Sequence, residues 1–147
     1  MIRTNNRVRL CAALLALNLL FIGGNSLMPA EISQAFSDWV KALLVKLLPG
    51  GSSSPTQGSG LLRKISHFVE FMALGILLTW LFGMLQKGRC LPFLTGAAAA
   101  CVDETIQFFV PGRAPGIKDV CIDSCGVLVG LALLTIGHHY LKKRSAN

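Results

Sequence analysis

The sequence predicts an all-α integral membrane bundle of four transmembrane helices plus one interfacial amphipathic helix. Of the 147 residues, 52% are hydrophobic and only 14% are charged, whereas soluble domains average about 25% charged residues. Four apolar stretches have the length of a bilayer span, because about 20 residues at 1.5 Å rise cross the hydrocarbon core. Most of the positive charge borders these stretches, where it anchors helices to lipid headgroups.

The four predicted transmembrane helices cover residues 10–28, 65–85, 91–110 and 120–138. Basic residues precede the first of them, so a cleaved signal peptide is an alternative to a retained helix. The stretch is long for the apolar region of a signal peptide, and Met28 occupies the −3 position of the candidate cleavage site, which requires a small residue. We therefore expect a retained helix.

The segment between the first two spans has two parts. In residues 31–48 the apolar side chains recur at helical spacing, which predicts an amphipathic helix. Such a helix lies in the membrane interface, and Trp39 is expected at the level of the headgroups. Residues 49–60 are rich in Pro, Gly and Ser and predict a flexible loop. We expect one membrane domain over residues 1–147.

The basic residues favour a multi-pass protein of the cell membrane with both termini in the cytoplasm. In that orientation eight of the 14 Lys and Arg residues lie inside and six lie outside, in agreement with the positive-inside rule. The eight are Arg3, Arg7, Arg9, Lys87, Arg89, Lys142, Lys143 and Arg144. The net charge of +7 is thus explained by the membrane, and we expect lipid rather than nucleic acid as a partner.

Polar residues interrupt or border three of the apolar stretches. They are Lys64, His67 and Glu70; then Asp103, Glu104 and Gln107, followed by Arg113; then Asp119 and Asp123. Successive spans cross the membrane in opposite directions, so these groups all lie on one side of it. A charge near the bilayer centre costs about 2.5–3.5 kcal/mol on insertion scales. We therefore expect the side chains to face inward and to form one polar pocket on the extracytoplasmic side. Asn25 and Ser26 end the first stretch on that same side.

Small residues predict close packing of the helices. Gly126 and Gly130 form a GxxxG pair on the face of the fourth span that also carries Asp119 and Asp123, and such pairs let a neighbouring helix approach closely. The five cysteines form no CxxC pair, so we expect packing residues rather than a disulfide framework or a zinc site. Neither a cofactor nor a metal is predicted by a recognised signature.

The polar residues leave three functional hypotheses open. They could bind a polar headgroup, a glycan-bearing lipid or a peptide-like ligand. They could instead form a membrane-embedded enzyme, with carboxylates as acid and base or around a divalent metal. They could also be a structural network that ties the helices together. HExxH and GxSxG motifs are absent from the sequence.

Several motifs occur in a fixed order along the chain. They are Lys64-x-x-His67-Phe68, Leu74-Gly75, Asp103-Glu104-x-x-Gln107, Pro111-Gly112-Arg113 and Asp119-x-x-x-Asp123-x-x-Gly126-x-x-x-Gly130. This order resembles the VanZ-like family of membrane proteins over residues 64–130, which is under half of the chain. The sequence departs from the family at Phe71, where Tyr is common, and at Asp123, where Asn is also common.

The resemblance implies a bacterial multi-pass protein of the cell envelope. The founding member of the family is associated with low-level resistance to the glycopeptide antibiotic teicoplanin, although many members lie outside resistance clusters. The resemblance gives the matching polar residues no defined roles. Our leading hypothesis is binding of a lipid-linked or glycolipid-like ligand, with Arg113 and Lys64 pairing with an anionic headgroup. Through this binding the protein would alter glycopeptide susceptibility. The oligomeric state is not predicted.

Overall fold

A computed structural model describes residues 2–47, 59–114 and 116–144. These residues contain no strand, and they form the helices α1 (Ile2–Leu27), α2 (Ala30–Leu47), α3 (Ser59–Met84), α4 (Leu91–Phe108) and α5 (Ile117–Arg144). The all-α prediction is confirmed. Of the predicted loop over residues 49–60, residues 49–58 lie outside the described residues. The prediction is wrong for its last two residues, because Ser59 and Gly60 belong to the first turn of α3.

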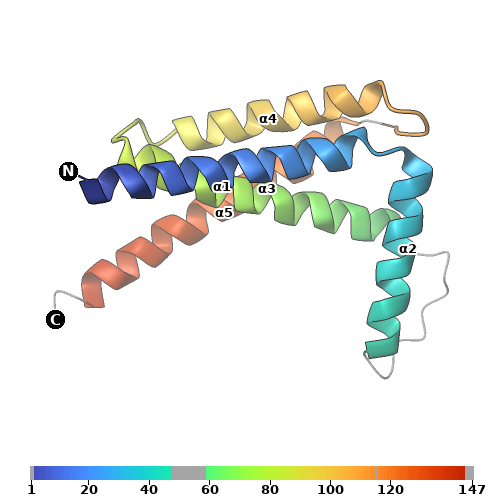
Figure 1. Ribbon diagram of the computed structural model, residues 1–147, viewed down its shortest axis with the longest axis horizontal. Coiled ribbons are helices and arrows are strands. Elements are labelled where there is room, and N and C mark those ends of the chain that lie inside the picture. Colours follow the sequence, from blue (N-terminus) through green and yellow to red (C-terminus); the bar gives the residue numbers. More distant parts are fainter. Residues whose placement is uncertain (1, 48–58, 115, 145–147) are drawn as a thin grey trace.

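The helices α1, α3, α4 and α5 lie lengthwise, and α2 stands across one end of them (Figure 1). α1 and α4 run in one direction, while α3 and α5 run in the other. The end of α1, the start of α3, the end of α4 and the start of α5 therefore meet where α2 stands, and we call this the α2 end. α1 begins and α5 ends at the opposite end of the bundle.

Three helical segments of the described residues are long and apolar enough to cross a membrane. They are Asn5–Leu27, Gly60–Met84 and Ile117–Arg144. The third predicted span, residues 91–110, corresponds to α4, which has 18 residues and is not among these three. Asp103, Glu104 and Gln107 lower the mean hydropathy of α4, so its composition alone does not mark it as a span.

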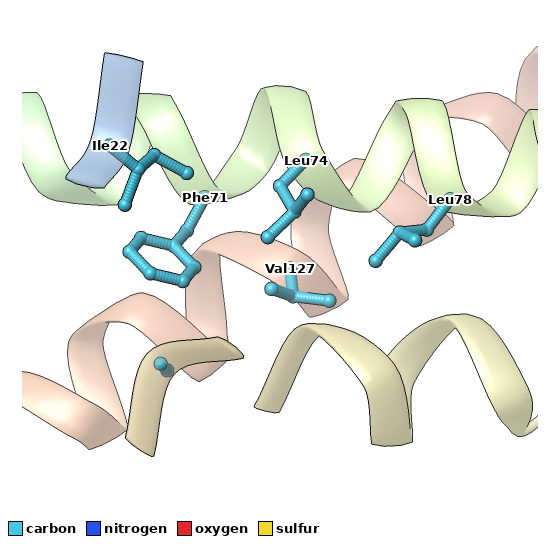
Figure 2. Close-up of a cluster of buried hydrophobic side chains, with 6 residues drawn as sticks. Ile22, Phe71, Leu74, Leu78 and Val127 are labelled. Atoms are coloured by element: carbon cyan, nitrogen blue, oxygen red, sulfur yellow. The ribbon is translucent and has the colours of Figure 1, made fainter. Parts of the chain in front are cut away.

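The hydrophobic core lies between the four lengthwise helices. Figure 2 shows Phe71, Leu74 and Leu78 of α3 pointing toward Val127 of α5, with Ile22 of α1 at one side. Many other large apolar side chains are exposed on the outer faces of the helices. Extensive exposed apolar surface marks a face that contacts membrane or protein. This thin core fits a bundle surrounded by lipid.

Glycines let α3 and α5 approach each other closely. A Cβ atom added at Gly126 would meet the backbone of Phe68, and one added at Gly130 would meet the backbone of Met72. Gly75 of α3 faces the backbone of Val127 in the same way. The two glycines of the GxxxG pair therefore lie at the contact between these helices.

The cysteines, all within the described residues, are free thiols. Cys11 is buried, and the other four are exposed. The expectation of packing residues is therefore right for Cys11 and wrong for Cys90, Cys101, Cys121 and Cys125. α4 and α5 turn their polar and glycine-bearing faces inward, which leaves their cysteines on the outside.

Candidate functional site

Asp103 lies at the centre of a buried hydrogen-bond network at the α2 end. The Ser26 hydroxyl of α1 donates to Oδ1 of Asp103, and the Gln107 amide donates to Oδ2 at 2.9 Å. His67 of α3 places Nδ1 at 3.7 Å from the same Oδ2. Ser26, Asp103 and Gln107 are buried. One carboxylate thus joins three helices.

α1 contributes a second polar contact. The Asn25 amide donates to Oε1 of Glu70 at 2.8 Å, which links the end of α1 to α3. The other oxygen of Glu70, Oε2, is buried and has no hydrogen-bond partner among the described residues. Asn25 and Ser26 belong to the site because they end the first apolar stretch on the side where the other polar groups lie.

Arg113 closes the end of α1. Its Nε donates to the carbonyl of Met28 at 3.2 Å, and its Nη2 donates to the carbonyl of Asn25 at 2.8 Å. Cationic side chains are favourable at helix C-termini, where carbonyls lack intrahelical partners. Burial lowers the pKa of Arg113, but a guanidinium remains charged in proteins. Nη1 has no partner in the described part of the chain.

Two further polar contacts lie at the α2 end. Glu104 accepts a hydrogen bond from the backbone N–H of Gly116 at 3.0 Å, which fixes the connection between α4 and α5. Nζ of Lys64 lies 3.5 Å from Oδ1 of Asp119, and both side chains are partly exposed. Exposed ion pairs of this kind contribute little to stability.

Asp123 is the most unusual residue of the site. It is only 1% exposed. Neither of its carboxylate oxygens has a hydrogen-bond partner in residues 2–47, 59–114 or 116–144. One ligand atom from each of His67, Asp103 and Asp123 lies within 4.8 Å of the others. A buried carboxylate without a partner is costly, and such groups normally pair with a cation or a metal.

A cavity of about 230 Å³ lies between the end of α1, α2 and the start of α3, and we call it the outer cavity. Its lining residues include Asn25, Ser33, Ser37, Arg63, His67, Glu70 and Arg113. Its apolar lining includes Phe21 and Phe36. Phe21 also lines an apolar groove of about 540 Å³ between α1 and α3, with Leu14, Leu17, Ile76 and Leu77.

The structure therefore brings the nine predicted polar residues to the α2 end, but in two groups. His67, Glu70 and Arg113 line the outer cavity. Lys64 does not line it and pairs with Asp119 instead. Arg63 lines the outer cavity as well, although its place in the sequence identified it only as one of the six basic residues outside the cytoplasm. Its position next to Lys64 indicates the level of Arg63 along α3, but not the direction in which its side chain points.

A family model described as VanZ/LLP1 matches residues 8–138. The chain belongs to the VanZ/LLP1 family. The resemblance found in the motifs over residues 64–130 is confirmed, and the VanZ/LLP1 match extends it to α1 and α2. No curated protein and no solved structure matches the chain. Membership of the VanZ/LLP1 family and the three apolar helices together indicate a membrane protein.

Proposed function

We propose that the chain is a four-span membrane protein of the cell envelope that binds the headgroup of an anionic, lipid-linked ligand in the outer cavity. The observation that carries the proposal is the pairing of two sites. A small polar cavity that contains two arginines adjoins an apolar groove, and Phe21 lines both. A polar pocket next to an apolar groove suits an amphiphile.

In this proposal α4 also crosses the membrane, together with α1, α3 and α5. Its 18 residues extend about 27 Å at 1.5 Å rise, close to the thickness of the hydrocarbon core. Asp103, Glu104 and Gln107 are buried against the other helices, whereas Leu94, Val102 and Phe108 are exposed. The surface that α4 presents to lipid therefore carries no charged side chain, although the helix as a whole contains Asp103 and Glu104.

α2 is the interfacial helix. Ile32, Phe36, Trp39 and Leu43 are exposed, while Ser37 is buried. α2 stands across the lengthwise helices (Figure 1), so it lies along the membrane surface when those helices cross the bilayer. The positive-inside bias of the sequence supports an extracytoplasmic α2 end and cytoplasmic termini. Labelling of a cysteine introduced at Ala114 by an impermeant reagent on intact cells tests this orientation.

The size and charge of the outer cavity select the part of the ligand that enters it. Pockets for drug-sized ligands span about 300–1,000 Å³, so a cavity of about 230 Å³ admits a headgroup and excludes lipid chains. Arg113 lines the cavity, and its buried Nη1 has no hydrogen-bond partner among the described residues. The planar guanidinium group of arginine binds phosphate and carboxylate groups through two parallel hydrogen bonds. The lipid chain would lie in the groove between α1 and α3.

Replacing Arg63 is expected to weaken headgroup binding without unfolding the bundle. Arg63 is only partly buried, and loss of its charged hydrogen bond is expected to lower affinity at least about tenfold. The measurement is fluorescence titration of Arg63→Gln in phosphatidylcholine nanodiscs with a short-chain polyprenyl phosphate. Arg89→Gln, at the opposite end of the bundle, is the control and should bind like the unmodified chain.

Equal affinities of Arg63→Gln, Arg89→Gln and the unmodified chain would contradict the proposed cavity. In cells, the unmodified chain should alter teicoplanin susceptibility, and Arg63→Gln should lose this effect while accumulating normally. A structural network without a ligand predicts the opposite, namely that any variant that accumulates also keeps the effect.

The polar cluster favours a second candidate function, catalysis on an envelope lipid or peptidoglycan precursor. The observation behind it is the unpaired Asp123 beside His67 and Asp103, because catalytic groups often sit in such costly positions. Turnover separates the two functions. Product that forms from labelled envelope lipids, and that is lost in an Asp103→Asn/Glu104→Gln double variant, would establish the enzyme.

A further inference from the structure

The three residues around Asp123 have the composition and spacing of a metal site. His67, Asp103 and Asp123 come from α3, α4 and α5, and one ligand atom of each lies within 4.8 Å of the others. Nδ1 of His67 and both oxygens of Asp123 have no hydrogen-bond partner among the described residues. The unpartnered atoms come from α3 and α5, and the Asp103 carboxylate of α4 lies beside them.

No lysine or arginine of the described residues satisfies Asp123. Arg113 donates to the carbonyls at the end of α1, and Lys64 pairs with Asp119. Buried charges in proteins are normally paired or coordinate a metal. A bound cation would therefore supply the positive charge that could pair with the Asp123 carboxylate.

We propose that Nδ1 of His67 and the carboxylates of Asp103 and Asp123 bind one divalent metal ion that accepts mixed nitrogen and oxygen ligands, such as Mn²⁺ or Zn²⁺. One imidazole and two carboxylates suit these ions better than Ca²⁺ or Mg²⁺, which take oxygen ligands. Four cysteines face outward and Cys11 lies in α1 away from the site, so thiolates do not contribute. The site deepens the second candidate function and is independent of lipid binding.

Neighbouring groups support the proposed ligands. Ser26 and Gln107 donate to Asp103 and hold its carboxylate in place, as outer-shell hydrogen bonds do for metal ligands. A cavity of about 10 Å³ adjoins the site and is lined by His67, Glu104, Gln107 and Asp123, among others. A space of this size admits about one water molecule. Three protein ligands with room for water are typical of catalytic rather than structural metal sites.

The test is titration of the complete chain with Mn²⁺ in nanodiscs of zwitterionic lipid, after treatment with EDTA. Mn²⁺ is chosen because it prefers carboxylate ligands to the exposed thiols. The electron paramagnetic resonance signal of free Mn²⁺ should decrease by the amount that corresponds to one bound ion per chain. Asp123→Asn should bind at least about tenfold more weakly. The control is Asp38→Asn, at an exposed position of α2 outside the proposed site, which should bind like the unmodified chain.

Binding should also raise the Tm of the unmodified chain, since a ligand that binds only the folded state stabilises it. This shift requires no variant, so it decides the question even where Asp123→Asn does not fold. Absence of both bound Mn²⁺ and a Tm shift would overturn the proposal. Equal binding by Asp123→Asn, or several weak sites per chain, would do the same. The discs contain no anionic ligand, so failure here leaves the lipid proposal untouched.

Discussion

Gly130→Ala is expected to separate α3 from α5 and to destabilise the bundle by about 2–3 kcal/mol, a typical cost of overpacking. A Cβ atom at this position would meet the backbone of Met72, which cannot move aside as a flexible side chain can. The intrinsic preference of helices for alanine over glycine, about 1 kcal/mol, acts in the opposite direction. A net loss of stability therefore reports the helix contact itself.

Gly137→Ala is the matched control, because Gly137 lies in the same helix and a Cβ atom there has no neighbour within 4 Å. This variant should be neutral or slightly more stable. Denaturant unfolding in detergent micelles, followed by circular dichroism, compares the two variants. Equal stabilities of Gly130→Ala and Gly137→Ala would show that α3 and α5 are not in close contact.

Asp103→Leu is expected to cost about 2–4 kcal/mol, because it leaves buried donors without an acceptor. Leucine is close in shape to aspartate, so loss of packing is a small part of the effect. The Ser26 hydroxyl and the Gln107 amide both donate to the Asp103 carboxylate. A charged acceptor strengthens such bonds.

A double-mutant cycle with Ser26→Ala separates this contact from other effects. Ser26→Ala should destabilise the unmodified chain and have little further effect in the Asp103→Leu background. Thr105→Leu, at an exposed position of α4, is the control and should leave stability unchanged. Full additivity of Ser26→Ala and Asp103→Leu would contradict a direct contact between α1 and α4.

The order and approximate bounds of the helices followed from hydropathy and helical periodicity. The meeting of the polar groups at one end followed from the alternation of span directions, a purely topological argument. The family followed from motifs whose order is specific. For these features local sequence is sufficient, because each apolar stretch must bury its polar residues against its neighbours to remain in lipid.

Other features depend on side-chain direction and could not be read from the sequence. Lys64 and Arg63 are adjacent, yet Arg63 lines the outer cavity and Lys64 pairs with Asp119. One residue turns a helix by about 100°, so a small error in the assumed face exchanges their roles. The outward position of four cysteines was missed for the same reason. The capping of α1 by Arg113 depends on a loop conformation that periodicity does not describe.

The central claim is that polar side chains from α1, α3, α4 and α5 meet in one interior site at the α2 end. Its most direct test is cross-linking of Ser26→Cys with Asp103→Cys by a short bis-thiosulfonate, in a chain whose native cysteines are replaced by alanine. Counting of the remaining thiols by maleimide gel shift should show that this pair reacts together. The control pair, Ser26→Cys with Thr105→Cys on the exposed face of α4, should keep both thiols unlinked. Equal cross-linking of the two pairs, or of neither, would contradict the claim.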